Sequence, residues 1–374
     1  MGSATPRELD VDEVVVAQAE VRRFVVDVMS KVGCSRQHAE QLANVLALSD
    51  YRGHQSHGIT RLHVYANEVD AGVVEKEGTP VVEKEKGATA WVDGRNLLGV
   101  VVGEFCMRLA IRKAKELGVA LVAARHSNHF GIAAHYAQMA ADEGLVGLAF
   151  TNTTPTTFPT RSKEAAIGTH PICCMARGEA GDGFCLDMAT STVCRGKVEL
   201  AKVKGGTCVP AGWGKDEAGA DSTDVGVILR NGGMAPLGSN ESTASYKGYG
   251  LNLMVELLTG ILAGGNYVPH VRSFNSADGV ADLAHSFLVL DPEAFAPGFP
   301  GRLQDMMDSM RRLLPVNDEE PVLVPGDPER HSIALCDSLG GLVYHKAILA
   351  RLDEMANGMG LEKLEVKTVR RVYY

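Results

Sequence analysis

Apolar residues recur at helical spacing through the N-terminal part of the chain. The pattern predicts one helix over residues 14–31, closed by Gly33, and a second helix that starts after the N-cap residue Ser35. A third helix pattern ends before Gly72. We therefore predict a small helical region here. The apolar faces of its second and third helices consist of Ala39, Leu42, Ala43, Leu46 and Ala47, and of Leu62, Tyr65, Ala66 and Val69.

Two continuous apolar runs further along are typical of strands buried on both faces. They are Val119–Ala124 and Leu145–Phe150, and a helix pattern that ends before Gly144 lies between them. A strand, a helix and a second strand in this order indicate a parallel or mixed sheet, so we predict an α/β fold. In such sheets, ligands bind beyond the carboxyl ends of the strands.

The rest of the pattern predicts elements on both sides of these runs. A helix is expected over Gly99–Leu117, and the charged residues 73–90 are expected to form a solvated loop or an edge. Residues 155–180 and 204–240 are rich in loop-forming residues and are predicted to be loops. Further strands are predicted at 91–94, 184–188, 287–290 and 322–324, and further helices at 247–262, 301–314 and 341–355.

Composition excludes several classes of function. The chain has 374 residues, of which 45% are hydrophobic and 22% charged, as is ordinary for a globular protein with a sizeable core. The net charge of -9 argues against nucleic acid or an anionic membrane as a partner. No apolar run approaches the roughly 18 residues that a membrane span requires.

The N-terminal residues and the cysteines lead us to expect a cytoplasmic protein. Met1–Asp12 is polar and acidic, and it lacks the basic start and apolar middle of a signal peptide. The 8 cysteines include no C-x-x-C pair, and Cys173 and Cys174 are adjacent, which is poor geometry for a disulfide bond. We therefore expect reduced, mostly buried thiols.

Ser56-His57-Gly58 followed by Arg61 is the first candidate for chemistry. Arginine offers a planar, permanent charge that fits a carboxylate, and histidine can give or take a proton near neutral pH. Arg61 follows His57 by one helical turn, so we expect both side chains on one face. Taken singly, Arg61 could equally form a surface ion pair, and His57 could cap a helix. Together they predict a site in which Arg61 holds the carboxylate of a 2-oxo acid while a histidine faces the oxo group.

A second candidate follows the first of the two buried strands. His126, Asn128 and His129 lie near its carboxyl end, and Thr151–Thr154 lie at the end of the next strand. Asn128 could orient an imidazole ring or bind the oxo group. Each histidine alone could instead be structural.

Clusters of histidine raise a metal-dependent hydrolase or lyase as a rival class. Neither cluster contains H-E-x-x-H, and no cysteine–histidine spacing matches a zinc motif, so we assign no metal ligand. The two clusters are His54, His57 and His63, and His126, His129 and His135.

Sequence signals for a nucleotide cofactor are weak. No G-x-G-x-x-G follows a predicted strand, so the standard dinucleotide fingerprint is absent. Asp187 at a strand end could bind ribose hydroxyls, with Met188 and Ala189 offering backbone groups beside it. Lys247 at a helix start could meet a phosphate, and Gly326-Asp327-Pro328 forms a tight turn. Each of these features is also explained by an ordinary turn or cap.

In combination, seven segments resemble the type-2 malate/L-lactate dehydrogenase family. This family also includes ureidoglycolate, sulfolactate and diketogulonate dehydrogenases and a cyclic-imine reductase. The segments occur in order over roughly residues 14–360, which is nearly the whole chain. They are Ser56-His57-Gly58-x-x-Arg61, Asn128-His129-Phe130-Gly131, Thr151-Asn152, Ile167-Gly168-Thr169-x-Pro171, Asp187-Met188-Ala189, Lys247-Gly248-Tyr249-Gly250-Leu251 and Pro325-Gly326.

The resemblance implies a fold that is not Rossmann, which accounts for the absent fingerprint. The implied fold is a mixed, NAD(P)-binding α/β sheet with helices, plus a helical substrate-side domain. Residues 86–329 would form the NAD(P)-binding domain, and residues 14–85 with 330–374 the helical dimerisation domain. The resemblance also implies a homodimer whose active sites lie near the subunit interface.

The resemblance also implies roles for single residues. His57 and His129 match positions of proton transfer, and Arg61 matches the carboxylate clamp. Ser56 and Asn152 would line the substrate. Many members have Ser-Pro after the asparagine, whereas this chain keeps only the hydroxyl, at Thr153. The implied cofactor contacts are Thr153, Asp187, Met188, Ala189, Lys247, Gly326, Asp327 and Pro328.

The expected activity is hydride transfer between a nicotinamide cofactor and a small 2-hydroxy or 2-oxo acid, with malate and oxaloacetate as the first choice. NAD is the expected cofactor. NADP is the alternative, because Arg195 and Lys197 lie just beyond Asp187 and could attract a 2′-phosphate or be surface charges. Two alternatives to this activity stay open. One is reduction of a cyclic imine or another C=N substrate on the same fold, and the other is a binding protein without catalysis.

Overall fold

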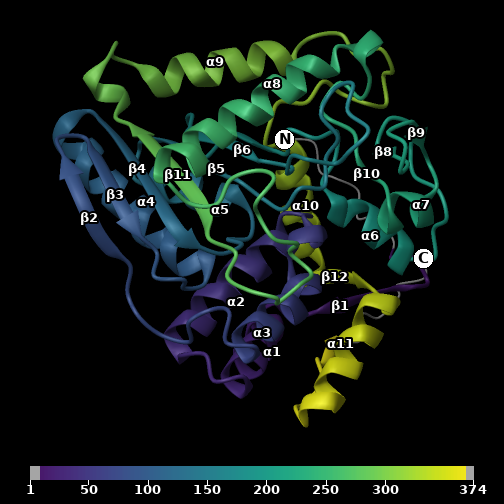
Figure 1. Cartoon of the computed structure of the whole chain (residues 1–374). Helices are drawn as coiled ribbons and strands as arrows, with labels where there is room; N and C mark the ends of the chain where they lie inside the picture. The colour runs from purple at the N-terminus through teal and green to yellow at the C-terminus, as the bar shows by residue number, and fades with distance from the viewer. Residues whose placement is uncertain (1–8, 368–374) are drawn as a thin grey trace.

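A seven-stranded sheet forms the centre of the computed structural model, which describes residues 9–367 (Figure 1). Its strands are β2 (Val81–Lys86), β3 (Thr89–Asp93), β4 (Val119–Ser127), β5 (Val146–Thr151), β6 (Ile172–Arg177), β7 (Gly183–Met188) and β11 (Leu283–Leu290). Their spatial order is β2-β3-β4-β11-β5-β6-β7. β3 and β4 pair in parallel, and the other neighbouring strands pair antiparallel. The predicted mixed α/β sheet is confirmed.

Two terminal segments lie outside the described residues. They are residues 1–8, which make up most of the polar Met1–Asp12 stretch, and residues 368–374, the end of the domain predicted to include 330–374.

The strand β11, far along the chain, occupies the middle of the sheet. β4 and β5 are joined through helix α5 (Ala133–Ala141), but β11 lies between them, with Phe287 opposite both Val122 and Ala149. β4 and β5 are therefore parallel, as the strand–helix–strand order predicted, without being neighbours. The carboxyl ends of β4, β5 and β7 consequently share one edge of the sheet with the starts of β6 and β11.

Helices cover both faces of this sheet. On one face lie α4 (Gly99–Leu117) and α5, and on the other lie α8 (Ser245–Glu256) and the π-helical segment η4 (Leu257–Ile261). Side chains along β4 alternate between the two faces. Val122 belongs to the main hydrophobic core beneath α4, whereas Ala123 packs with Ala263 and Ala284 near η4.

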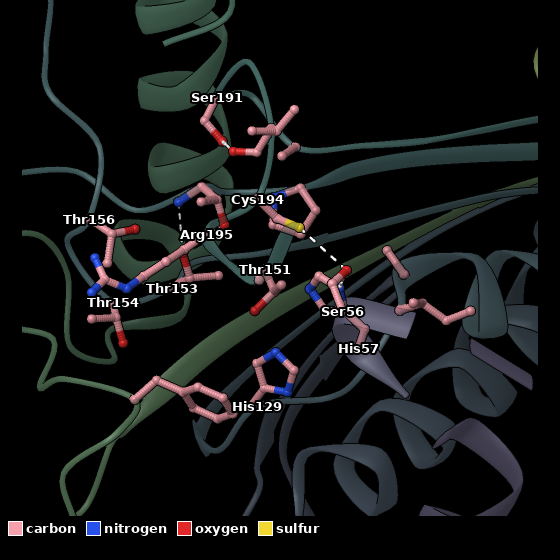
Figure 2. A pocket seen from close by; sticks show the side chains of 18 of the residues that line it. Ser56, His57, His129, Thr151, Thr153, Thr154, Thr156, Ser191, Cys194 and Arg195 are labelled. Carbon is pink, nitrogen blue, oxygen red and sulfur yellow. Dashed lines mark hydrogen bonds between the residues drawn. The ribbon is translucent and has the colours of Figure 1, made fainter. Parts of the chain in front are cut away.

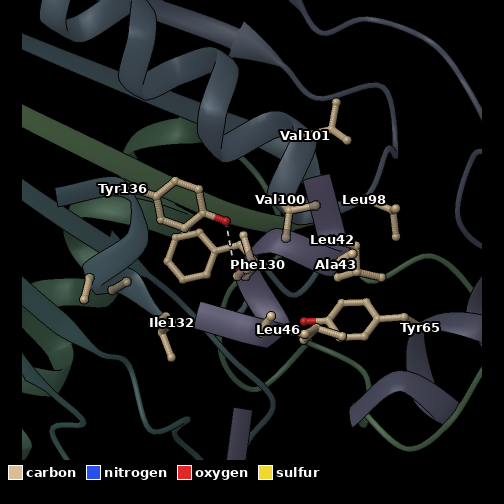
Figure 3. Close-up of a cluster of buried hydrophobic side chains, with 14 of the residues drawn as sticks. Leu42, Ala43, Leu46, Tyr65, Leu98, Val100, Val101, Phe130, Ile132 and Tyr136 are labelled. Carbon is tan, nitrogen blue, oxygen red and sulfur yellow. Dashed lines mark hydrogen bonds between the residues drawn. The ribbon is translucent and has the colours of Figure 1, made fainter. Parts of the chain in front are cut away.

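The predicted helical region is confirmed. It consists of α1 (Gln18–Lys31), α2 (Arg36–Tyr51) and α3 (Leu62–Asp70), and Ser35 caps α2 by accepting a hydrogen bond from the backbone N–H of His38. The apolar faces predicted for its second and third helices are buried. They share one continuous hydrophobic core with the sheet. Figure 3 shows part of this core, with Leu46 and Tyr65 near Phe130. Phe130 in turn stacks on Tyr136 with 4.6 Å between the ring centroids.

A small sheet joins the two ends of the described chain and corrects two predictions. β1 (Glu13–Val16) pairs with both β12 (Leu342–His345) and β13 (Val366–Lys367). The helix predicted to start at residue 14 is therefore wrong at its first turn, where Val15 and Val16 are fully buried strand residues. The helix predicted over 341–355 is in fact β12 followed by α11 (Lys346–Met359).

Further differences fall in segments whose local pattern is weak. β6 lies inside residues 155–180, which were predicted to be a loop, and residues 322–324 form no strand. Helix α10 (Asp327–Leu339) was not predicted, nor was α6 (Arg195–Val203). Residues 204–240, which were also predicted to be a loop, contain α7 (Val225–Arg230) and the three short strands β8 (Gly214–Lys215), β9 (Asp221–Ser222) and β10 (Gly233–Met234). Helix α9 (Phe299–Arg311) lies where a helix over 301–314 was predicted.

Close packing of α5 on β5 leads to a stability prediction. A Cβ atom on Gly147 would lie 2.6 Å from the carbonyl oxygen of Ala137. We expect Gly147→Ala to lower the free energy of unfolding by about 1–3 kcal/mol through overpacking. Gly358→Ala is the matched control, because no atom lies within 4 Å of the added Cβ. That change should raise stability by up to about 1 kcal/mol through helix propensity. Equal denaturant midpoints for the two variants would contradict the packing argument.

Candidate active site

A cavity of about 730 Å³ lies at the sheet edge where β4, β5 and β7 end (Figure 2). Two 3₁₀ turns, η1 (Gln55–His57) and η2 (Ile59–Arg61), the first turn of α6 and the loop at residues 271–275 also line it. Its volume is typical of small-molecule sites. The predicted site residues that line it are Ser56, His57, Arg61, His129, Asn152, Thr153, Asp187, Met188 and Ala189.

The buried carboxyl group of Asp50 holds the segment that carries Ser56, His57 and Arg61. Its Oδ2 atom accepts hydrogen bonds from the backbone N–H of Ile59, at 2.9 Å, and from the hydroxyl of Tyr344, at 2.7 Å. A side chain at Gly58 would collide with this carboxyl, because a Cβ atom there would lie 1.8 Å from Oδ1. Glycine in the Ser-His-Gly motif is thus required by the close approach to Asp50.

Arg61 faces the cavity with one edge of its guanidinium already engaged. Its Nε atom donates to the carbonyl of Ser56 at 2.7 Å, and its Nη2 atom forms an ion pair with Glu199 of α6 at 2.6 Å. Burial opposes ionisation of Glu199, but the charge and hydrogen bond of Arg61 outweigh burial and lower the pKa of that carboxyl. Arg61 is therefore fixed in position.

The two predicted histidines, His57 and His129, lie side by side in the cavity lining. Their imidazole rings are stacked with centroids 5.8 Å apart and an angle of 17° between their planes. His57 Nδ1 is 2.9 Å from the hydroxyl of Ser56. His129 Nδ1 lies 2.6 Å from the hydroxyl of Tyr65 and also accepts from the backbone N–H of Gly131. Because a backbone N–H only donates, we assign the proton of neutral His129 to Nε2.

Both imidazoles are neutral at neutral pH in this environment. Burial lowers the pKa of His57 to about 4, and the positive charge of Arg61 contributes further. Burial, together with His57 and Arg61, also lowers the pKa of His129 well below its ordinary value. A neutral imidazole can accept a proton, and an anion bound beside Arg61 would raise both pKa values again.

Asn152 lines the cavity, but its side-chain amide is engaged in hydrogen bonds to neighbouring parts of the fold. Its Nδ2 atom donates to the carboxylate of Glu256 at 3.1 Å and to the carbonyl of Asn266 at 2.8 Å, and its Oδ1 atom accepts from the backbone of Ala284 at 2.9 Å. Glu256 is also paired with the buried side chain of His170. Contact between Asn152 and a substrate remains a prediction.

The wall formed by β7 and the residues after β5 fits a nicotinamide cofactor. Asp187 uses one carboxylate oxygen to accept from the backbone N–H of Ala134 at 2.9 Å, and its other oxygen has no hydrogen-bond partner among residues 9–367. Thr153, Met188 and Ala189 add a hydroxyl, apolar surface and backbone groups beside it. These groups could receive a ribose and a nicotinamide ring.

The other predicted cofactor contacts lie outside the cavity lining of this single chain. Lys247 is exposed on the first turn of α8. Gly326 packs against Cys185 near the start of β7, and Asp327 is paired with Arg311. This segment still approaches the site, because Glu329 in the same helix pairs at 3.2 Å with His54, which lines the cavity. Roles of Lys247, Gly326, Asp327 and Pro328 at the cofactor remain predictions.

Two other residues near the second histidine serve the fold instead. His126 pairs with Asp93 at 3.0 Å and does not line the cavity. Asn128 is buried and donates to the carbonyl of Leu97 at 2.8 Å.

Three functional neighbours were missed by the sequence analysis. Tyr65 was assigned only to a buried face, although its hydroxyl reaches His129. Phe274 places its ring centroid 4.5 Å from that of His129 from a loop without periodicity. Glu199 sits on α6, whose helical pattern was not recognised, although its spacing of four from Arg195 was a usable signal.

Two features that residues 9–367 lack bear on the alternatives. No group of three or more histidine, cysteine, aspartate or glutamate side chains in this range is placed to hold a metal ion. No helix there is long and apolar enough to cross a membrane.

Comparison with known proteins gives matches over nearly the whole chain. A family model described as malate/L-lactate dehydrogenase matches residues 16–353. The chain is 36% identical to a malate dehydrogenase of Pyrococcus abyssi over 361 residues, covering 96% of this chain and 98% of that protein. It is 33% identical to a (2R)-3-sulfolactate dehydrogenase (NADP(+)) of Chromohalobacter salexigens, covering 85% and 91%. The structure of malate dehydrogenase from Pyrococcus horikoshii OT3 matches with a TM-score of 0.87 at 34% identity, covering 96% and 99%.

The cavity holds one guanidinium and two neutral imidazoles, and together with the dehydrogenases that the chain resembles it identifies an NAD(P)-dependent oxidoreductase of small 2-hydroxy acids. The chain belongs to the malate/L-lactate dehydrogenase family.

The carboxyl group of Asp50 should make stability depend on pH. Burial raises its pKa from the ordinary value of 3.8 to about 7. Between these values the folded protein keeps a proton that the unfolded chain releases, so this group's contribution to stability falls as pH rises through 7. We expect Asp50→Asn to remove that dependence. Unfolding free energies at pH 5 and pH 8 should show the parent losing stability relative to the variant at the higher pH. Parallel curves for the two proteins would contradict the assignment.

Proposed function

We propose that the protein interconverts malate and oxaloacetate with NAD as cofactor. The observation that carries this proposal is the convergence of Arg61, His57 and His129 on one cavity. The family supplies the reaction class, and the malate dehydrogenases among the relatives support the choice of acid. A guanidinium beside two proton-transfer groups is what a 2-oxo acid requires.

In the proposed mechanism Arg61 binds the carboxylate next to the reacting carbon. The bonds to Ser56 and Glu199 occupy one edge of the guanidinium, so its other edge is available for a bidentate pair. His57 exchanges a proton with the C2 oxygen, and His129, oriented by Tyr65, polarises that oxygen by donating a hydrogen bond from Nε2. A nicotinamide cofactor held beside Thr153, Asp187 and Ala189 would supply or accept the hydride at C2. Phe274 packs against His129 with 4.5 Å between the ring centroids and adds apolar surface at this end of the cavity.

Several features support NAD and a cytoplasmic location within this proposal. The free carboxylate oxygen of Asp187 suits a ribose hydroxyl and would repel a 2′-phosphate. NADP remains the alternative, because one relative is named as NADP-dependent. All 8 cysteines are free thiols, as expected in a reducing compartment.

We also propose a homodimer that uses the outer face of α8 and η4. The polar and apolar faces of this helix are reversed relative to an ordinary surface helix, because the polar residues Asn252, Glu256 and Thr259 are buried. Its exposed side is apolar, and such a surface marks an interface. The face lies within residues 86–329, so it would extend the contact beyond the predicted dimerisation domain. The exposed apolar residues are Tyr246, Leu251, Leu253, Met254, Leu257, Ile261 and Leu262.

The histidines give the first test of this function. We expect His57→Ala and His129→Ala each to lower kcat for oxaloacetate by about 10²–10⁴-fold, because the first removes the proton-transfer group and the second removes the donor that polarises the oxo group. His126→Ala is the matched control, since His126 lies outside the cavity, and its turnover should equal that of the parent. The measurement is NADH or NADPH oxidation with oxaloacetate. If both cavity variants turned over like the parent, the mechanism would be wrong.

The same assay separates the rival substrate class. Pyruvate and the cyclic imines that precede proline and pipecolate are included with each cofactor. Faster turnover of an imine than of every 2-oxo acid would replace the proposed substrate while leaving the family unchanged.

Charge placed on the outer face of α8 and η4 gives a test of assembly. Leu257 and Ile261 are 58% and 55% exposed in the single chain. We expect the double change Leu257→Asp and Ile261→Asp to convert a dimer into a folded monomer, measured by light scattering after gel filtration. Val81→Asp, on the edge strand β2, is the control and should leave the mass unchanged. A parent protein that is already monomeric would refute the proposal.

A further inference from the structure

Two arginines in the cavity share a single carboxylate. Glu199 pairs with Arg61 through Oε2 at 2.6 Å and with Arg195 through Oε1 at 3.4 Å. All three side chains line the cavity and are mostly buried, with 13%, 25% and 26% of Arg61, Glu199 and Arg195 exposed. One carboxyl group therefore separates two guanidinium groups, and the arginine pair is left with a net positive charge.

The guanidinium of Arg195 is held in place but not fully used. Its Nη2 atom donates to the carbonyl of Leu229 at 2.6 Å, which ties it to α7. Its Nη1 atom has no hydrogen-bond partner within the described residues. A fixed arginine with free donors in a cavity is suited to an anion, because little side-chain entropy remains to be lost on binding.

The first turn of α6 adds to the positive potential at this place. The cavity lining includes Cys194, Arg195 and Gly196, and no side chain caps the start of the helix. Glycine at position 196 lets this turn lie directly against the segment that carries Arg61, since a Cβ atom there would lie 2.4 Å from Nη2 of Arg61. Unpaired N–H groups at a helix start favour negative charge.

We propose that Arg195 binds the second anionic group of the substrate, a carboxylate or sulfonate at the far end from the group held by Arg61. This inference rests on the proposed function and names the residue that selects a doubly charged acid over a singly charged one. The sequence left Arg195 open as a partner for the 2′-phosphate of NADP. Its contacts place it with Arg61 through Glu199, so we assign it to the acid.

The experiment compares two acids that differ in the second group. We expect Arg195→Gln to lower kcat/KM for oxaloacetate by about 10- to 100-fold, as for loss of a charged hydrogen bond, while kcat/KM for pyruvate changes less than about threefold. Arg195→Lys, which keeps the charge without the planar fork, should lie between the parent and Arg195→Gln for oxaloacetate. Lys202→Gln is the control, because it removes one positive charge from the same helix outside this cavity and should leave both acids unaffected.

Each other outcome has a distinct meaning. Equal losses for oxaloacetate and pyruvate in both Arg195 variants would overturn the inference and leave the proposed function standing. A change confined to the ratio of NADPH to NADH use would overturn it in favour of the 2′-phosphate. Failure of the parent protein to oxidise either cofactor with any 2-oxo acid would overturn the proposed function and this inference together.

Discussion

Two hydrogen bonds to one buried carboxyl group determine where most of the site's chemistry lies. Asp50 on α2 accepts hydrogen bonds from Ile59 and from Tyr344. The segment that carries Ser56, His57 and Arg61 is therefore tied both to the N-terminal helices and to β12, near the other end of the chain. The close approach at Gly58 leaves this segment no room to shift. Ser56, His57 and Arg61 are therefore positioned by the core rather than by a mobile loop. Such support from beneath is what preorganised sites require.

The electrostatics of the cavity follow from its burial. Imidazoles that are removed from water and placed near a guanidinium stay neutral, while Glu199 offsets one of the two arginine charges without blocking the free donors of either arginine. An incoming acid anion would add to the negative charge near His57, where Asp187 and Glu199 already oppose the effect of burial on its pKa. Binding and proton transfer are thereby linked, because the same anion that pairs with Arg61 makes a protonated imidazole easier to form.

The sequence predicted those parts of the fold that local patterns encode. The helix at Gly99–Leu117 and the two apolar strands were recognisable because their spacing is unambiguous over many residues. β12 was taken for helix because four residues are too few to show a period of two, and its pairing with β1 joins residues far apart in sequence. The position of β11 in the sheet has no local signal either.

Prediction of the site had the same limits. His57, Arg61 and His129 stood out because histidine and arginine beside glycine suggest chemistry and because the segments resemble a family. Tyr65 was predicted as a core residue and its side chain is indeed buried. Its hydroxyl reaches His129 only through tertiary packing, which the local sequence does not encode. Arg195 looked like a surface or phosphate-binding charge until α6 was placed against Arg61.

The central place of β11 has a consequence for biosynthesis. β4 and β5 cannot gain their shared neighbour until the chain has been made through residue 290. Each therefore exposes an unpaired, largely apolar edge while more than a third of the chain is being synthesised. Pairing so remote in sequence also makes folding slow. Nascent chains of this protein should therefore depend on chaperones that shield strand edges, and truncation before β11 should yield aggregates rather than a smaller folded unit.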